Sequence, residues 1–346
     1  ASCYALTPDD GSDGYSTIKG SCERFSDVHA KNTADAATTI NQDGIQVLLN
    51  LEGWTSMGRT NDIFALSPAP VQLMYMGYPG TVAAPFIHNL VTDATVSPPE
   101  TAGFYGEKLI YLPSYYVNDY KQTHPNMVPP PMAESRTTFG LPKRGFLFTN
   151  LNNLYKLSPD MFDVWVNVVK RSPGASLVLL SLPADAEANL RREAKARGLP
   201  SHALHFVPMI NKAANMERAS GASLFLDTQL VNAHTTAMDV LYAGLPLLAL
   251  PHMRFSSRVA AAVLRALGCD VTITRSPQDY ETLAVHLATH PESNSRVRQC
   301  VQERRGKAAL FDTRAWVRDW DRTLRTAWDV HFQSRRVYHL VTAVER

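Results

Sequence analysis

The feature that most constrains the fold is an alternation of short apolar runs with longer helical segments. In the second half of the chain, strands are expected at 145–150, 176–182, 205–207, 223–227, 245–250 and 271–274. Helices are expected from Ser158, over 185–197, near Lys212, from Thr236 and over 256–267. Alternation of this kind predicts a parallel sheet, because parallel strands are joined by helical crossovers. The second half is therefore expected to be a doubly wound α/β domain.

The first half repeats the pattern with shorter elements. Apolar runs predict strands at 45–51, 71–76, 86–91 and 108–112, with helical pieces around 61–66 and 98–105. Residues 1–6 are typical of a strand already under way. A second α/β domain is the expected result.

A polar stretch with Pro125 and the triplet 129–131 separates the halves, and proline is tolerated in neither helix nor strand interiors. We place the interdomain linker there. In the last helical segment, Trp316, Trp320, Leu324 and Trp328 recur every four positions, which is typical of core packing. The expected divisions are a Rossmann-like domain over 1–120, a linker over 121–136, a second Rossmann-like domain over 137–312 and a helical segment over 313–346 that packs back on the core.

Composition narrows the class of partner. The chain has 346 residues with 45% hydrophobic content, enough for two cores, and a net charge of +2 predicts neither a nucleic-acid nor a membrane partner. No apolar run approaches the ~20 residues that a membrane span needs. Four scattered cysteines without a C-x-x-C pair predict a reducing compartment and no structural metal; they are Cys3, Cys22, Cys269 and Cys300.

The most informative strand-to-helix turn is 227–239. Ligands bind doubly wound sheets at the carboxyl ends of strands, where helix N-termini attract anions. There, Thr235 and Thr236 begin a helix that could hold a phosphate, with His234 beside them and Asp239 placed to accept from ribose hydroxyls. The alternative is structural: Thr236 is a helix N-cap, Asp239 its capping-box-like partner, and His234 merely exposed.

Two further turns lie at the same edge of the predicted sheet. One carries Lys156, which could neutralise a departing diphosphate, and the other carries Lys212, Asn215 and Arg218 on one helical face; solvated surface charge is the alternative for both. The sequence has no G-x-x-x-x-G-K-[ST] motif, which argues against a P-loop NTPase. It also has no clear G-x-G-x-x-G after a strand, which argues against a standard dinucleotide-binding enzyme. The one D-x-D, at 319–321, falls in a predicted helix, so a metal-independent mechanism is favoured.

The stretch NAHTTAMDVLYAGLP at 232–246 closely resembles the nucleotide-binding segment of O-GlcNAc transferases. Six more segments are similar to that family in the same order: CYALTPDDGS at 3–12, INQDGI at 40–45, FALSPAPVQLMYMGYPGT at 64–81, EKLIYLP at 107–113, NNLYKLSP at 152–159 and SRVAAAVL at 257–264. Nearly the whole chain resembles the catalytic region of glycosyltransferase family 41, which includes the O-GlcNAc transferases and the SPINDLY type.

The resemblance implies a GT-B fold of two facing Rossmann-like domains and inverting transfer of N-acetylglucosamine. The donor would be UDP-GlcNAc, and the acceptors would be Ser and Thr hydroxyls of cytoplasmic and nuclear proteins. The residue roles that it implies are stabilisation of the diphosphate by Lys156, phosphate binding by His234, Thr235 and Thr236, ribose binding by Asp239, a place beside the uridine for Lys212 and Arg218, and acceptor-backbone contact by Asn41.

Departures from the family pattern keep two alternatives open. Asn153 replaces a donor-binding Gln, Asn215 replaces a donor-contacting His, and Gln46 replaces a His of the first domain. The G-N-H-P-T-S-H segment and the tetratricopeptide repeats of the family are missing, so we expect the first domain to be truncated at its N-terminus. The alternatives are a GDP-fucose-dependent protein O-fucosyltransferase and a catalytically impaired nucleotide-sugar-binding module.

Overall fold

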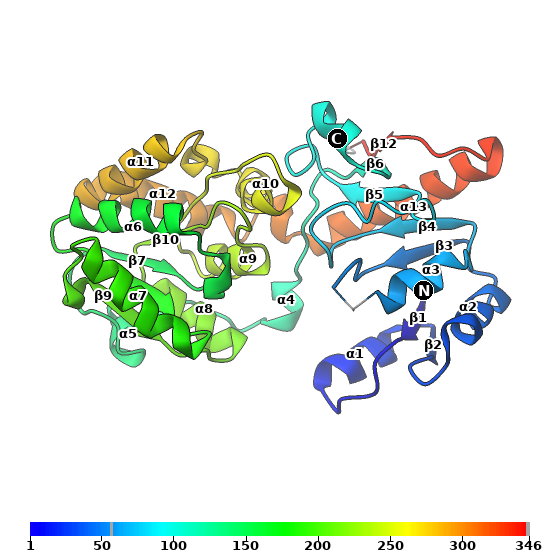
Figure 1. Ribbon diagram of the computed structural model, residues 1–346, viewed down its shortest axis with the longest axis horizontal. Helices are drawn as coiled ribbons and strands as arrows, with labels where there is room; N and C mark the ends of the chain where they lie inside the picture. The colour runs from blue at the N-terminus through cyan, green and yellow to red at the C-terminus, as the bar shows by residue number, and fades with distance from the viewer. Residues whose placement is uncertain (56–57, 344–346) are drawn as a thin grey trace. The chain divides into compact units, whose positions relative to one another are not determined.

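The computed structural model describes residues 1–55 and 58–343, which form two compact units (Figure 1). The first unit comprises Ala1–Thr92, Pro99–Leu112 and Trp320–Arg346, and the second comprises Asp93–Pro98 and Pro113–Asp319. The stretch expected as a linker, 121–136, thus lies within the second unit. Within the described residues, no helix has the length and apolar character to cross a membrane.

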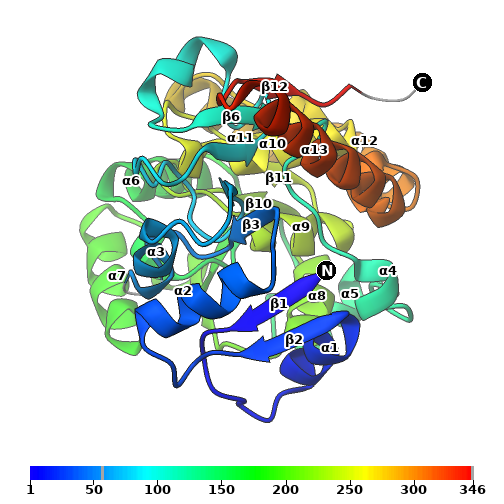
Figure 2. The same cartoon turned by 90° about the vertical axis from the view of Figure 1, so that its right-hand side faces the viewer.

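The first unit holds a five-stranded parallel sheet in the order β12-β6-β5-β4-β3 (Figure 1). A separate parallel pair is formed by β1 and β2 (Figure 2). Its strands are β1 (Ser2–Ala5), β2 (Arg24–Asp27), β3 (Val47–Asn50), β4 (Val71–Met74), β5 (Asn89–Thr92), β6 (Lys108–Tyr111) and β12 (Leu340–Val341). Its helices are α1 (Asp13–Ser21), α2 (Thr33–Gln42), α3 (Arg59–Ala65) and the 3-10 helix η1 (Pro99–Phe104). All residues of β4 and β5 are buried, as expected for central strands of a parallel sheet.

The second unit holds a five-stranded parallel sheet in the order β11-β10-β7-β8-β9. Its strands are β7 (Leu147–Asn150), β8 (Ser176–Leu180), β9 (Leu204–Val207), β10 (Leu224–Leu226) and β11 (Leu247–Leu248). Its α-helices are α4 (Tyr120–Thr123), α5 (Met132–Thr138), α6 (Pro159–Lys170), α7 (Ala184–Ala196), α8 (Lys212–Ser220), α9 (Thr235–Tyr242), α10 (Val259–Leu267), α11 (Pro277–Thr289) and α12 (Pro291–Arg304). Short 3-10 helices are η2 (Leu154–Lys156), η3 (Ser201–Ala203), η4 (Phe255–Ser257), η5 (Asp270–Thr272) and η6 (Ala309–Phe311). The strand order is that of a Rossmann-like sheet, as predicted.

Helices α6 and α11 pack on one face of this sheet, against the apolar side chains of its strands. Trp165 of α6 and Tyr280 of α11 are fully buried in that core. Because right-handed crossovers place helices according to the direction in which the strands advance, α8 and α9 belong to the opposite face. Successive strands are therefore added in one direction from β7 to β9 and in the other direction from β10 to β11, and the switch point of the sheet lies between β7 and β10.

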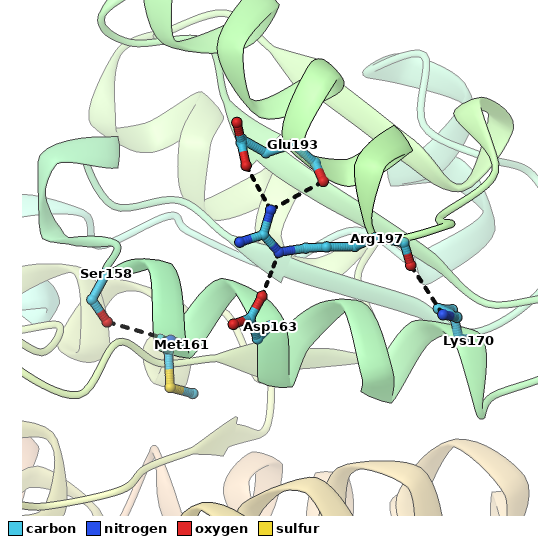
Figure 3. A network of polar contacts seen from close by, with 6 residues as sticks. All are labelled: Ser158, Met161, Asp163, Lys170, Glu193 and Arg197. Atoms are coloured by element: carbon cyan, nitrogen blue, oxygen red, sulfur yellow. Dashed lines mark hydrogen bonds and ion pairs between the residues drawn. The ribbon is translucent and has the colours of Figure 1, made fainter.

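A polar clamp joins α6 to α7 (Figure 3). Arg197, which follows α7, forms ion pairs with Asp163 of α6 and with Glu193, at 2.7 Å for the latter. Lys170 donates to the Arg197 carbonyl over 3.0 Å. The first turn of α6 is capped by Ser158, whose hydroxyl accepts from the Met161 N–H at 3.4 Å. The start of α6 is thus fixed by its own sequence and by packing.

Helix α13 (Thr313–Ser334) divides between the units, with residues from Trp320 onward in the first. The Trp320 ring lies 4.6 Å from that of Tyr75, and β12 continues the sheet by pairing with β6. The four side chains expected to form a core stripe are only partly buried, whereas Thr323 and Ala327 are buried.

Three predicted elements differ from the structure. The strand expected at 271–274 is wrong: Val271 is 68% exposed within η5, and only Ile273 forms a bridge, to Ala249. The helix expected over 256–267 begins at Val259, after η4. The helix expected at 98–105 is the 3-10 helix η1.

The four cysteines form two disulfides, Cys3–Cys22 and Cys269–Cys300, each with a Cα–Cα distance of 6.1 Å. The prediction of reduced cysteines, which rested on their wide spacing, is therefore wrong. Each disulfide lies within one unit. Spacing along the sequence gave no sign of this pairing, because the fold brings the partners together.

Candidate functional site

The site is at the carboxyl ends of β7 and β10, where the sheet reverses its strand order. Adjacent strands that lead into helices on opposite faces leave a crevice there, which is the usual ligand position in such sheets. Asn150, at the end of β7, joins the two strand ends: its amide donates to the Leu226 carbonyl over 2.7 Å and its Oδ1 accepts from the Asn152 N–H at 3.0 Å. The loops that follow β7 and β10, together with helix α9, carry Lys156 and five of the eight predicted donor-binding residues, and the other three lie on α8.

Lys156 ends the short helix η2 that follows β7. Asn153 is the N-cap of η2 and accepts from the Tyr155 N–H at 3.4 Å, so its amide has a local structural role in this structure. The Lys156 ammonium donates to the Asn232 carbonyl over 3.1 Å, which brings the β7 loop against the loop after β10. Burial lowers the pKa of Lys156, and the nearby Asp227 opposes that shift. A partly buried ammonium at this position is available to an incoming anion.

Asp227 follows β10 and is completely buried. Its Oδ1 accepts from the N–H groups of Thr228 and Ala233 at 2.9 and 2.8 Å, which closes the loop between β10 and α9. Its Oδ2 has no hydrogen-bond partner in the described part of the chain. Burial raises the pKa of Asp227 to about 7, against the opposing charge of Lys156. The sequence prediction assigned no role to this residue, although an acid directly after a buried apolar strand is the signal that marks it.

The start of α9 presents unused N–H groups. His234 is the N-cap, and no side chain caps the helix, so the structural alternative with Thr236 as N-cap is wrong. The first N–H groups of a helix have no intrahelical acceptor, which leaves those of Thr235 and Thr236 available to an anion. Both threonine side chains are at least partly accessible. This geometry suits the predicted phosphate-binding role.

His234 donates through Nε2 to the Ser256 carbonyl at 3.0 Å, since a carbonyl can only accept. Burial lowers the pKa of His234 to about 4, so the ring is neutral near pH 7 and its Nδ1 carries no proton. The ring therefore has no second N–H to offer a phosphate in this state. Protonation at Nδ1 would supply one.

Asp239 lies one turn into α9 and is 9% exposed. Its Oδ1 pairs with the Lys212 ammonium at 3.1 Å and also accepts from the Tyr120 hydroxyl. The Lys212 ammonium lies 4.9 Å from the centre of the Tyr120 ring. Asp239 and Lys212, predicted for ribose and uridine, therefore contact each other, and Tyr120 is a member of the site that the sequence prediction missed.

Arg218 and Asn215 form a second pair on α8. The Arg218 side chain is buried; it donates to the Pro208 carbonyl over 2.7 Å and to the Asn215 Oδ1 over 2.6 Å. Burial lowers the pKa of Arg218 to about 10. Asn215 and Arg218 contact each other, as their spacing on one helical face predicts. Arg218 is buried, however, so the alternative of a solvated surface charge is wrong for this residue, which holds the loop after β9 through the Pro208 carbonyl. Among the described residues, no partner is seen for the amide N–H groups of Asn215.

Asn41 belongs to the first unit, at the last turn of α2. Its amide donates to the Pro68 carbonyl over 3.2 Å, and the residue is exposed. Asp319 and Asp321, the D-x-D pair, lie in α13, where Asp321 pairs with Arg325 at 2.8 Å. Across the described residues, no three His, Cys, Asp or Glu side chains are grouped so as to hold a metal ion.

Solved structures share this fold. A mutant O-GlcNAc transferase from Thermobaculum terrenum superposes with a TM-score of 0.86 at 21% identity, covering 96% of this chain and 62% of that one. The Anabaena protein HepE in complex with UDP superposes with a TM-score of 0.63 at 12% identity, covering 94% of this chain and 92% of that one. The fold is therefore of the GT-B class, as predicted.

Relatives with curated names match most of the chain. The probable UDP-N-acetylglucosamine–peptide N-acetylglucosaminyltransferase SEC of Arabidopsis thaliana is 39% identical over 339 residues, which cover 97% of this chain and 35% of the relative. The corresponding transferase of Caenorhabditis elegans is 27% identical over 451 residues, covering 99% of this chain and 39% of the relative. The chain thus spans little more than a third of these relatives. The model of glycosyl transferase family 41 matches residues 1–130 and 126–320, and the chain belongs to that family.

Proposed function

We propose that the chain transfers N-acetylglucosamine from UDP-GlcNAc to Ser or Thr hydroxyls of proteins, with inversion at the anomeric carbon. The observation that carries the proposal is the meeting of Lys156 with the α9 loop at the switch point of the sheet. A relative 39% identical to the chain bears the name of this activity. The retained segment at 232–246 favours UDP over GDP as the nucleotide.

The proposed reaction is a single displacement. The acceptor hydroxyl oxygen forms a bond to the anomeric carbon and loses its proton to solvent water. The bond from that carbon to the β-phosphate oxygen breaks, and UDP leaves with the electron pair. Lys156 turns from the Asn232 carbonyl to the phosphate, and the free N–H groups of Thr235 and Thr236 bind the same charge. These groups supply positive charge at the leaving group, so the proposed mechanism needs no metal ion.

The test is Lys156→Met, with Lys195→Met as the matched control. Removing one preorganised positive group from a leaving group costs about 100- to 1,000-fold in kcat. We expect that loss in transfer to a Ser/Thr peptide, with UDP affinity retained, whereas exposed Lys195 on α7 should tolerate the change. Unchanged transfer by Lys156→Met would overturn the role of Lys156.

Nucleotide preference and turnover separate the two alternatives. Calorimetry should show binding of UDP and not of GDP; the reverse result would favour O-fucosyl transfer. Binding of UDP without transfer to any Ser/Thr peptide would favour a catalytically impaired module. Acceptor proteins are recognised in the same reaction, so the peptide assay also tests the proposed partner class.

A cytoplasmic or nuclear location belongs to the proposal, because the family resemblance implies acceptors there. The two disulfides are evidence against it, since disulfides persist in oxidising compartments and are rare in the cytosol. Alkylation of the protein's free thiols in acid-quenched cells shows whether its cysteines are reduced, as in the cytosol, or paired in disulfides, as in an oxidising compartment. Four labelled cysteines support the location, and no labelled cysteine contradicts it.

A further inference from the structure

Residues 114–120 form a short segment, here named the tyrosine strap, that runs along α9 in the second unit. Its beginning is held independently of α9: the Trp316 indole donates to the Ser114 carbonyl over 3.0 Å, and the Tyr115 N–H donates to buried Asp93 over 3.0 Å. The Tyr115 ring also packs edge-on against Phe255, at 5.2 Å. The path of the strap is therefore set by anchors other than the helix that it follows.

Two strap tyrosines meet α9 in register. The Tyr116 hydroxyl lies 2.6 Å from the Thr235 hydroxyl, and the Tyr120 hydroxyl donates to the Asp239 carboxylate. Both pairs join residues 119 positions apart in the chain. Residues four apart on a helix share a face. Each tyrosine thus contacts a different member of the candidate donor site.

The Tyr116 contact fixes a direction of hydrogen bonding when an anion is bound. Burial raises the pKa of Tyr116, so the phenol keeps its proton near neutral pH. A phosphate oxygen can only accept, so Thr235 must donate its one hydroxyl proton to it. The remaining acceptor position of Thr235 is then filled by Tyr116, which donates. The result is a chain from Tyr116 through Thr235 to the diphosphate.

The Tyr120 contact leaves one oxygen of Asp239 open. Tyr120 and Lys212 both contact Oδ1, and no partner of Oδ2 is recorded in the described residues. The Tyr120 ring is itself held, stacked 4.4 Å from Tyr242. A carboxylate fixed through one oxygen presents the other in a set direction, which suits a ribose hydroxyl.

We propose that Tyr116 and Tyr120 are positioning residues for two different parts of the donor. Tyr116 orients Thr235 toward the diphosphate, and Tyr120 orients Asp239 toward the ribose. The inference rests on the proposed function, since it takes a uridine diphosphate sugar as the ligand.

The experiment compares Tyr116→Phe, Tyr120→Phe and a control, Tyr242→Phe, by calorimetry with uridine and with UDP. The Tyr242 hydroxyl has no hydrogen bond recorded in the described residues, and its change to Phe keeps the ring that stacks on Tyr120. A lost hydrogen bond corresponds to about 3- to 10-fold in affinity. We expect Tyr116→Phe to lower the affinity for UDP by that factor and to leave the affinity for uridine unchanged. Tyr120→Phe should lower the affinities for uridine and for UDP by the same factor. Tyr242→Phe should change neither affinity.

A double-mutant cycle separates positioning from loss of structure. In a Thr235→Val background, Tyr116→Phe should have no further effect on UDP affinity, because the residue through which it acts is gone. Equal weakening of uridine and UDP by Tyr116→Phe, or an undiminished effect in the Thr235→Val background, would overturn its role. If Tyr120→Phe leaves the affinity for uridine unchanged, the proposed role of Tyr120 in orienting Asp239 is overturned. If the unaltered chain binds no UDP, it is the proposed function that fails.

Discussion

At the scale of single residues, Asp227 makes stability depend on pH in an unusual direction. Its pKa is about 7 in the folded protein and near 3.8 without the fold, so the folded state binds more protons between those values. Stability from this group is therefore full below pH 3.8 and is lost progressively as pH rises to about 7. The contribution is on the order of a few kcal/mol, from about 1.4 kcal/mol for each unit of pKa.

Asp227→Asn isolates that contribution, because an amide can still accept from Thr228 and Ala233 through its oxygen. We expect the free-energy difference between the original protein and the variant to shift in favour of the variant as pH rises from 4 to 7. Urea unfolding at four pH values measures it. A difference that is constant with pH would show that Asp227 is ionised throughout.

His234 predicts an uptake of protons on ligand binding. Its pKa of about 4 leaves it neutral at pH 6, and a diphosphate beside it favours the charged ring. UDP binding at pH 6 should therefore take up more protons in the original protein than in His234→Gln. Calorimetry in two buffers of different ionisation enthalpy counts the protons, and the variant corrects for titration of UDP itself. Equal uptake in both proteins would remove the charged ring from the binding mechanism.

The positions of site residues in the fold were predictable where the signal is local. Lys156 and the residues at 234–236 were predicted because a strand, a loop and a helix start follow one another in the sequence, and the fold brings them together. Tyr116 and Tyr120 were not, because their partners are 119 residues away. Arg218 was placed beside the uridine by the family resemblance, and neither that resemblance nor its helical spacing shows that its side chain is buried and donates to the Pro208 carbonyl. The individual donor and acceptor roles stay predictions.

At the scale of elements, helix caps give a matched pair of variants. Ser158 caps α6 directly after the Lys156 loop, and Ser276 caps α11 by accepting from the Asp279 N–H at 3.1 Å. Both helices have proline at their first position and pack on each other. Replacing either serine by alanine should cost about 1 kcal/mol of stability.

Only Ser158→Ala should also lower turnover, because it loosens the helix start that positions Lys156; we expect a several-fold fall in kcat at unchanged peptide KM. Chemical denaturation and a transfer assay on both variants test this. Equal turnover in the two variants would mean that the Lys156 loop is positioned by its contact with Asn232 alone.

Secondary-structure elements were predictable where every residue of the element is buried. They were not predictable where contacts with distant parts of the chain determine the structure of a segment. Strands β4, β6, β7 and β8 coincide with apolar runs, since central parallel strands are buried on both faces. Strand β12 has two residues and an exposed Val341, which no periodicity reveals. The proline-rich stretch predicted as a linker, 121–136, overlaps α5, where buried Arg136 donates to the Gly221 and Gly145 carbonyls.

At the scale of the whole molecule, each unit has its own sheet and its own disulfide. A unit with its own core can unfold on its own. All the predicted donor-binding residues lie in the second unit. UDP should therefore raise the unfolding temperature of that unit alone, because a ligand stabilises only the state that binds it.

Removing each disulfide in turn shows which unit gives rise to each of the two thermal unfolding transitions. Cys269–Cys300 spans 31 residues and Cys3–Cys22 spans 19, and closing loops of these lengths stabilises by about 3 to 4 kcal/mol. Changing both cysteines of a pair to serine should lower the transition of the unit that holds that pair. In scanning calorimetry, Cys269→Ser with Cys300→Ser should lower the transition that UDP raises, and Cys3→Ser with Cys22→Ser the other. If both double variants lower one common transition by the same amount, the units unfold together and the donor site draws its stability from the entire chain.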